Sequence, residues 1–213
     1  MKNLKMSDLK ENNAPPPLQD FVKKYYGEKE FELGCVAAQI IKTDPGSSCW
    51  IYYTYLPHKI SIPWAVDCVN MDREIDSKVV RETLKRIVGW SKKALKATEI
   101  KLQVLSAAVY KEWVNLVNKK KQWQYQAIQH LVDLPFYTPH PCESSALEHV
   151  LNSLSNATGV SPKTGILDYR KKDAAYLEFA KIGMSFWGRS LGSNSIQLDK
   201  SIPRGRVAIP AEE

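Results

Sequence analysis

The sequence has few cysteines, four in 213 residues, and they follow no pattern that binds a metal or indicates redox activity. Cys35, Cys49, Cys68 and Cys142 include no Cys-x-x-Cys pair, and three of them fall in apolar segments, where cysteine acts as a small hydrophobic residue. We therefore expect free thiols and a reducing compartment. A chain of this length buries enough surface to fold without disulfides or a structural metal.

Long apolar runs are also missing. No uncharged hydrophobic segment approaches the roughly 18 residues that a membrane-spanning helix needs. Residues 1–8 contain no apolar core of a secretion signal. We expect an intracellular, soluble protein with neither a signal peptide nor a transmembrane segment. The composition, 44% hydrophobic and 25% charged, is that of an ordinary folded domain, which excludes disorder throughout.

Acidic residues are scarce in one part of the chain. Lys and Arg total 30 against 23 Asp and Glu, but residues 78–121 hold twelve of the cations and only three of the acids. This block therefore carries a net charge of +9, and the rest of the chain −2. Positive charge concentrated in one block predicts an anionic partner more strongly than the same excess spread over the surface.

The N-terminal half is rich in β-branched and aromatic residues, which favour strands. Asp44-Pro45-Gly46 between two such runs is typical of a hairpin turn. Apolar and polar residues alternate after Pro57, and Pro63 would place that strand at a sheet edge. The predicted strands cover residues 31–41, 49–55, 60–69 and 99–105.

Helical spacing of apolar residues marks other segments. The predicted helices cover residues 19–28, 77–96, 110–131, 145–159 and 173–187. We expect the fourth strand to lie between the helix of residues 77–96 and the next helix. The order β-β-β-α-β-α predicts an α+β fold with a mixed sheet of about four strands, followed by a helical C-terminal half.

Proline and the loss of periodicity mark the expected boundaries. Pro15–Pro17 close a polar start, and Pro135, Pro139 and Pro141 separate the two halves. The expected segments are a flexible Pro-rich arm (1–17), an α+β core with the basic helix (18–134), a helical subdomain packed on the core (135–192) and an unpatterned tail (193–213).

No catalytic constellation is complete. The predicted strand order is similar in topology to ribonuclease-H-like folds, but a two-metal nuclease needs three converging carboxylates, and only Glu32 and Glu82 are in place. Asp67 with Glu99 and Lys101 would suit a restriction-type nuclease, but a whole predicted helix separates the acid from the other two. We therefore expect a non-enzymatic protein without a cofactor.

Four possible zinc ligands, His130, His140, Cys142 and His149, lie within twenty residues, but their spacing matches no known zinc site. We expect packed or solvated side chains and no metal. Residues 159–165 lack the glycine pattern of a phosphate-binding loop, and we predict a helix cap followed by a turn there.

The remaining signal is positive charge beside aromatic residues. The predicted helix at 77–96 carries its cations on the outward sides, and Lys119–Lys121 precede Trp123 and Tyr125. Lysine and arginine neutralise phosphates, and exposed aromatic rings stack on unpaired bases. The candidate nucleic-acid-binding residues are Lys78, Arg81, Lys85, Arg86, Lys92, Lys93, Lys96, Lys119, Lys120, Lys121, Trp123 and Tyr125.

We predict a structural or assembly protein that binds nucleic acid or another polyanion nonspecifically, because lysine outnumbers arginine in the block. Loose ends around a basic core are common in virion coat, nucleocapsid and matrix-like proteins, and would allow self-association through the arm and tail.

Three alternatives stay open. A protein-interaction or anionic-membrane-surface module would use the edge strand with Trp64 and the aromatic residues of 50–55. The basic face also suits a plain solvated surface with no partner. A small enzyme would need a site that the sequence does not reveal.

Overall fold

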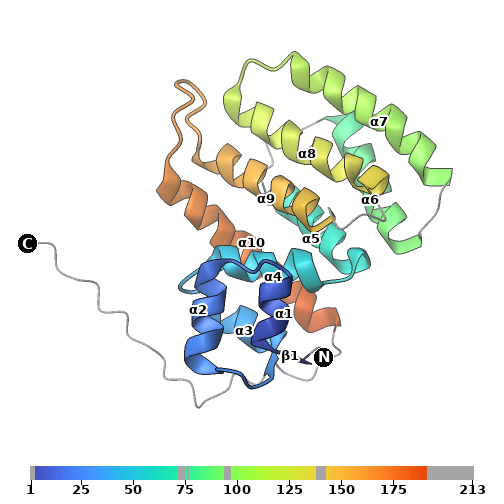
Figure 1. Ribbon diagram of the computed structural model, residues 1–213. Helices are drawn as coiled ribbons and strands as arrows, with labels where there is room; N and C mark the ends of the chain where they lie inside the picture. Colours follow the sequence, from blue (N-terminus) through green and yellow to red (C-terminus); the bar gives the residue numbers. More distant parts are fainter. Residues whose placement is uncertain (1–2, 72–74, 76, 94–96, 138–142, 191–213) are drawn as a thin grey trace, which may run out of the picture.

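The computed structural model describes residues 3–71, 75, 77–93, 97–137 and 143–190 (Figure 1). These residues are mostly helical, so the predicted α+β fold with a four-stranded mixed sheet is wrong. The sheet within the described ranges is a single antiparallel pair of two-residue strands, in which β1 (Asn3–Leu4) pairs with β2 (Phe31–Glu32).

The rest of the architecture is a set of helices joined by short connections. The N-terminal helices are α1 (Met6–Glu11), α2 (Pro16–Tyr25), α3 (Leu33–Ile40), α4 (Pro45–Tyr55) and α5 (His58–Asn70). The later helices are α6 (Lys78–Lys93), α7 (Ala97–Val114), α8 (Lys119–Tyr137), α9 (Glu143–Gly159) and α10 (Tyr169–Ser190).

All four predicted strands fall mainly in helices. Residues 31–41 form β2 and α3, residues 49–55 lie in α4, residues 60–69 lie in α5, and residues 99–105 lie in α7. The first three helices are buried on most sides, so their apolar residues do not follow a clear helical period. A short apolar run of this kind cannot be distinguished from a buried strand by its pattern.

The predicted hairpin turn is in fact a helix start. Asp44 is the N-cap of α4, and its carboxylate accepts a hydrogen bond from the backbone N–H of Ser47 at 3.3 Å. Pro45 is the first helical residue, where its fixed φ is favourable and no N–H is needed. The same Asp-Pro-Gly sequence therefore satisfies a helix N-terminus as well as a turn.

Pro63 lies inside α5 and not at a sheet edge. It is the sixth residue of the helix, so the hydrogen bond it cannot donate is the one to the carbonyl of Lys59, in the exposed first turn. The proline therefore removes one hydrogen bond near the start of the helix.

The predicted flexible arm is packed in its described part, residues 3–17. Leu4, Met6 and Leu9 are buried in the main core, and Pro16 begins α2. The segment is polar on average, which predicted a flexible arm, but three closely spaced apolar residues fix it to the core. The predicted tail at 193–213 lies outside the described residues.

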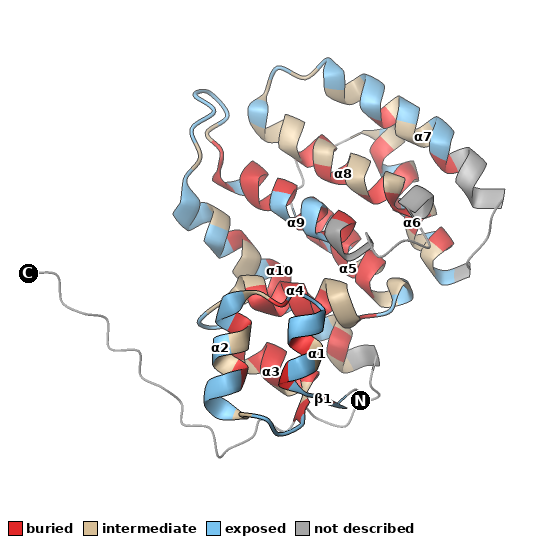
Figure 2. Cartoon of the chain, viewed as in Figure 1, coloured by how far each residue is buried: buried red, intermediate tan, exposed pale blue. Residues whose placement is uncertain are grey.

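Buried residues from nearly the whole described chain form one hydrophobic cluster, from Leu4 to Trp187 (Figure 2). Helices α5 to α9 form one part of the molecule and α1 to α4 the other (Figure 1). Helix α10 joins the two parts, because it packs on α9 and α5 and also on α4 and α3. This arrangement leaves α6 and α7 at one side of the molecule.

Three predicted helices are confirmed. Residues 77–96 contain α6, residues 145–159 lie in α9, and residues 173–187 lie in α10. Helix α10 begins earlier than expected because Asp168 caps it and accepts a hydrogen bond from the backbone N–H of Arg170 at 3.0 Å. The turn predicted after α9 is also present, with Gly165 at a φ of +72°.

Within the described ranges, no helix combines the length and the apolar character that crossing a membrane would require.

Candidate functional site

The outward side of α6 carries a single row of cations. Lys78, Arg81, Lys85 and Lys92 are all exposed, and their spacings of three, four and seven residues place them on one helix face. Gly89 occupies the remaining position of this row. We call these four cations the α6 basic row. The opposite side of the helix holds Val80, Leu84, Ile87 and Trp90 in the core.

The acid of α6 does not interrupt the basic row. Glu82 lies at the flank of the helix and pairs with Arg86, with 2.6 Å between the Arg86 Nε and a Glu82 oxygen. This hydrogen bond and the charge of Arg86 hold the pKa of Glu82 below its usual range. Arg86 is therefore committed to a neighbour on its own helix and is not part of the basic row.

Two more predicted residues have no described side-chain position. The backbone of Lys93 ends α6, and Lys96 lies outside the described residues.

The second basic cluster lies at the start of α8. Asn118 caps this helix, since its side-chain oxygen accepts the N–H of Lys121 at 3.1 Å. Lys119 is exposed and donates to the Gln122 side-chain oxygen at 3.1 Å, whereas Lys120 and Lys121 are half-buried. The run of three lysines therefore presents Lys119 as its most open cation.

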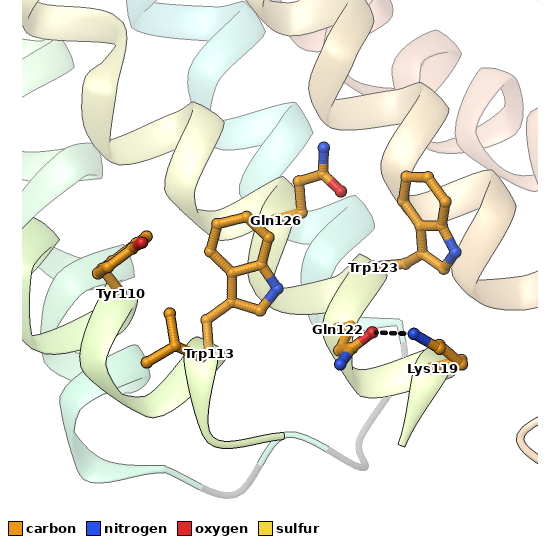
Figure 3. A pocket seen from close by; sticks show the side chains of 7 residues that line it. Tyr110, Trp113, Lys119, Gln122, Trp123 and Gln126 are labelled. Carbon is orange, nitrogen blue, oxygen red and sulfur yellow. Dashed lines mark hydrogen bonds between the residues drawn. The ribbon is translucent and has the colours of Figure 1, made fainter. Parts of the chain in front are cut away.

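A groove of about 410 Å³ lies between the end of α7 and the first half of α8. We call it the aromatic groove, because Tyr110, Trp113 and Trp123 line it (Figure 3). Trp113 lies between Tyr110 and Gln126 in this view, and the Tyr110 and Trp113 rings meet edge to face at 5.7 Å. The other lining residues are Val114, Lys119, Gln122 and Gln126.

Tyr125 does not belong to this groove. It is buried and donates its hydroxyl to Glu112 at 2.7 Å. Burial and the Glu112 contact raise the pKa of Tyr125 to about 12. A buried ring has no face open to a base, so we remove this residue from the candidate set.

The sequence prediction missed Tyr110 and Trp113 as groove residues. The helix predicted over residues 110–131 would turn its apolar residues to the core, but Tyr110 is 53% and Val114 is 56% exposed. The signal that could have found them is a helix with apolar residues on all sides, because such a helix leaves one apolar face without a partner in its own chain.

The structure does not support the nuclease and zinc sites considered from the sequence. Asp67 and Glu99 lie on helices and not on strands, so the hairpin of the restriction-type arrangement is absent. The described residues also lack the four-stranded sheet that the two-metal arrangement of Glu32 and Glu82 requires. His130 and His149 stack with ring centroids 5.4 Å apart, but no group of three metal-ligating side chains occurs in the described part of the chain. His140 and Cys142 lie outside that part.

The surface predicted for the interaction-module alternative is also wrong. Trp64 is fully buried, and its indole N–H donates to the carbonyl of Phe179 at 2.9 Å. Tyr52 is fully buried and Trp50 is 8% exposed. Trp64 of α5 and Tyr52 of α4 contact α10, through Phe179 and Trp187 respectively.

Comparison with known proteins yields no relative: no family profile, curated protein or solved structure matches this chain.

Proposed function

We propose that the protein binds nucleic acid or another polyanion nonspecifically, through the α6 basic row, as a structural or assembly protein. The main support for this proposal is that four cations share one exposed face of α6, while the acidic residue of α6, Glu82, pairs with Arg86. A solvated face without a partner would be expected to mix both signs of charge.

The length of the row suits a phosphate backbone. From Lys78 to Lys92 the helix rises about 21 Å, at about 1.5 Å per residue. One strand of nucleic acid places roughly six phosphates along that distance, at about 3.4 Å each. The row is therefore long enough for its flexible cations to contact several phosphates of one nucleic acid molecule. Contacts of this kind carry no base-sequence information.

The aromatic groove adds a possible contact for bases. Trp113 and Trp123 provide ring faces, Gln122 and Gln126 provide amide donors and acceptors, and Lys119 provides a cation at one end. Stacking on such rings accepts every base, so it favours single strands without selecting a sequence.

The test compares two variants that lose the same charge. The row variant changes Lys78, Arg81, Lys85 and Lys92 to Gln. The control variant changes Lys10, Lys23, Lys29 and Lys42 to Gln, four exposed lysines in the part of the molecule formed by α1 to α4. Both variants keep a net charge of +3, so only the place of the lost charge differs.

Binding is measured by fluorescence anisotropy with a labelled mixed-sequence single strand and with a duplex at low salt. We expect the row variant to lose most of its affinity for both probes and the control variant to keep it. Trp123→Leu should weaken single-strand binding about tenfold and leave duplex binding unchanged, because only unpaired bases can stack. Absence of binding by the wild type, or equal loss in the two charge variants, would refute the proposal.

A further inference from the structure

A pocket of about 310 Å³ lies among α5, α8, α9 and α10. It shares no lining residue with the aromatic groove. Its volume is at the small end of the range for sites that bind small molecules. Some of its lining residues are exposed and form the rim, whereas the buried ones form what we call the floor. The floor consists of Cys68, Gln124, Leu154, Ala157, Ala175 and Phe179.

The floor contains one amide side chain, and that amide lacks a hydrogen-bond partner. Gln124 is 0% exposed on α8. Neither its side-chain nitrogen nor its side-chain oxygen forms a hydrogen bond with the described residues. Most buried polar atoms are paired, because an unmade hydrogen bond away from water is costly. A donor and an acceptor therefore lie side by side in the wall of the pocket, and both are unpaired.

The polar side chains of the rim are already paired. The Thr158 hydroxyl donates a hydrogen bond to the backbone carbonyl of Leu154 at 3.1 Å. The Glu178 carboxylate accepts a hydrogen bond from the Lys181 ammonium at 2.6 Å. Among the described residues that line the pocket, the unmet hydrogen-bonding capacity is thus that of the Gln124 amide.

The rest of the floor is apolar and uncharged. Burial raises the pKa of the Cys68 thiol well above its usual value, so this thiol stays protonated. Aliphatic and aromatic surface comes from Leu154, Ala157, Ala175 and Phe179. A charged group that entered the floor would lose its water without gaining a counter-ion there. The floor therefore favours a neutral molecule.

The Gln124 amide defines the polar edge of such a molecule. Its carbonyl oxygen accepts hydrogen bonds, and its NH2 group donates them beside that oxygen. A lactam or a primary amide presents the opposite pair, an N–H beside a C=O, so one planar group can satisfy both atoms of Gln124. A water molecule can meet one of these atoms, but the apolar remainder of the floor offers it few further partners.

We propose that this pocket binds a neutral, planar and mostly apolar small molecule, through a lactam or primary amide group that pairs with Gln124. This inference does not depend on polyanion binding, because it uses neither the α6 basic row nor the aromatic groove. It is tested without nucleic acid, so failure of either proposal is distinguishable from failure of the other.

The first experiment compares two compounds of the same shape. Carbostyril is a flat bicyclic lactam, and coumarin has the same rings with an oxygen atom in place of the N–H. Titrations followed by ligand-observed NMR measure the Kd of each compound for the wild-type protein. We expect carbostyril to bind about tenfold or more tightly, because coumarin leaves the Gln124 oxygen unpaired. No binding of carbostyril, or equal binding of the two compounds, would overturn the proposal.

A substitution tests the amide itself. Gln124→Leu replaces the unpaired amide by an apolar side chain of similar size, so the variant should unfold at no lower temperature than the wild type. It should lose the preference for carbostyril over coumarin. The matched control is Gln103→Leu, which changes an exposed glutamine of α7 outside the pocket and should keep that preference. A preference that persists in Gln124→Leu would show that another site binds the lactam.

A variant of the rim locates the compound even where Gln124→Leu does not fold. Ala174 is an exposed rim residue on α10, and Ala174→Trp places a large ring at the mouth of the pocket. It should weaken carbostyril binding about tenfold or more. The control Ala107→Trp makes the same change at an exposed alanine of α7 and should leave the Kd unchanged. If Ala174→Trp binds carbostyril as tightly as this control does, the proposed site is wrong.

Discussion

Gly183 of α10 packs directly against the Tyr52 ring of α4, and an added methyl group tests this packing. A Cβ at residue 183 would overlap Cδ2 and Cε2 of the Tyr52 ring and lie 3.1 Å from its Cγ. The ring cannot move aside easily, because Trp64 and Trp187 contact it with centroids 5.4 Å and 5.9 Å away. Gly183→Ala should therefore force the two helices apart.

The expected cost has two opposing parts. Overpacking a core of this kind costs about 1–3 kcal/mol. Alanine is favoured over glycine in a helix by about 0.8–1 kcal/mol, which offsets part of that cost. Gly89→Ala is the matched control, since a Cβ at residue 89 of α6 would meet nothing within 4 Å. The control should gain the propensity term alone, so the two variants should differ by about 1–3 kcal/mol.

Thermal unfolding measures this difference. A change of 1 kcal/mol shifts the Tm of a domain of this size by about 2–4 °C. We expect Gly89→Ala to unfold above the wild type and Gly183→Ala below Gly89→Ala by several degrees. If Gly183→Ala raises the Tm as much as Gly89→Ala does, the close packing of α4 on α10 is refuted.

Two further predictions concern single side chains. Burial, and then the neighbouring His149, lower the pKa of His130. The unfolded chain therefore binds this proton more readily, and stability should fall as the pH drops below about 6.5 towards the lower folded pKa. The Tm difference between pH 7.5 and pH 5 should shrink in His130→Gln and shrink less in His149→Gln, whereas an unchanged difference would exclude this histidine as a cause. Trp64→Phe should cost about 1–3 kcal/mol in urea unfolding, because the Phe179 carbonyl loses its indole donor at 2.9 Å inside the core; a loss below about 0.5 kcal/mol would show that this hydrogen bond contributes little.

The sequence predicted the amphipathic helices and failed on the buried ones. Helix α6 has one apolar and one basic face, so its period is visible in the chain. Helix α5 lies in the middle of the fold, and both of its main faces contact other helices. Residues such as Ile62 and Trp64 then look like a strand, because local propensity is weaker than the packing that decides their conformation.

The candidate site was predicted in part for a similar reason. Charge placement on α6 follows from helical spacing alone, so the basic row could be read from the sequence. The aromatic groove forms between α7 and α8, so it depends on how these two helices pack. A local sequence pattern does not predict that packing. Tyr125 was chosen for its place beside Lys121, but it faces inward and bonds Glu112.

The central claim is that the α6 basic row contacts phosphates, and the salt dependence of binding tests it most directly. Each neutralised phosphate contributes about −0.7 to the slope of log K against log salt for a single strand and about −0.9 for a duplex. The row variant should therefore have a slope about 3 to 4 smaller in magnitude than the wild type, measured between about 50 and about 300 mM salt. The control variant with four other lysines changed should keep the wild-type slope. Equal slopes in the row and control variants would contradict the account.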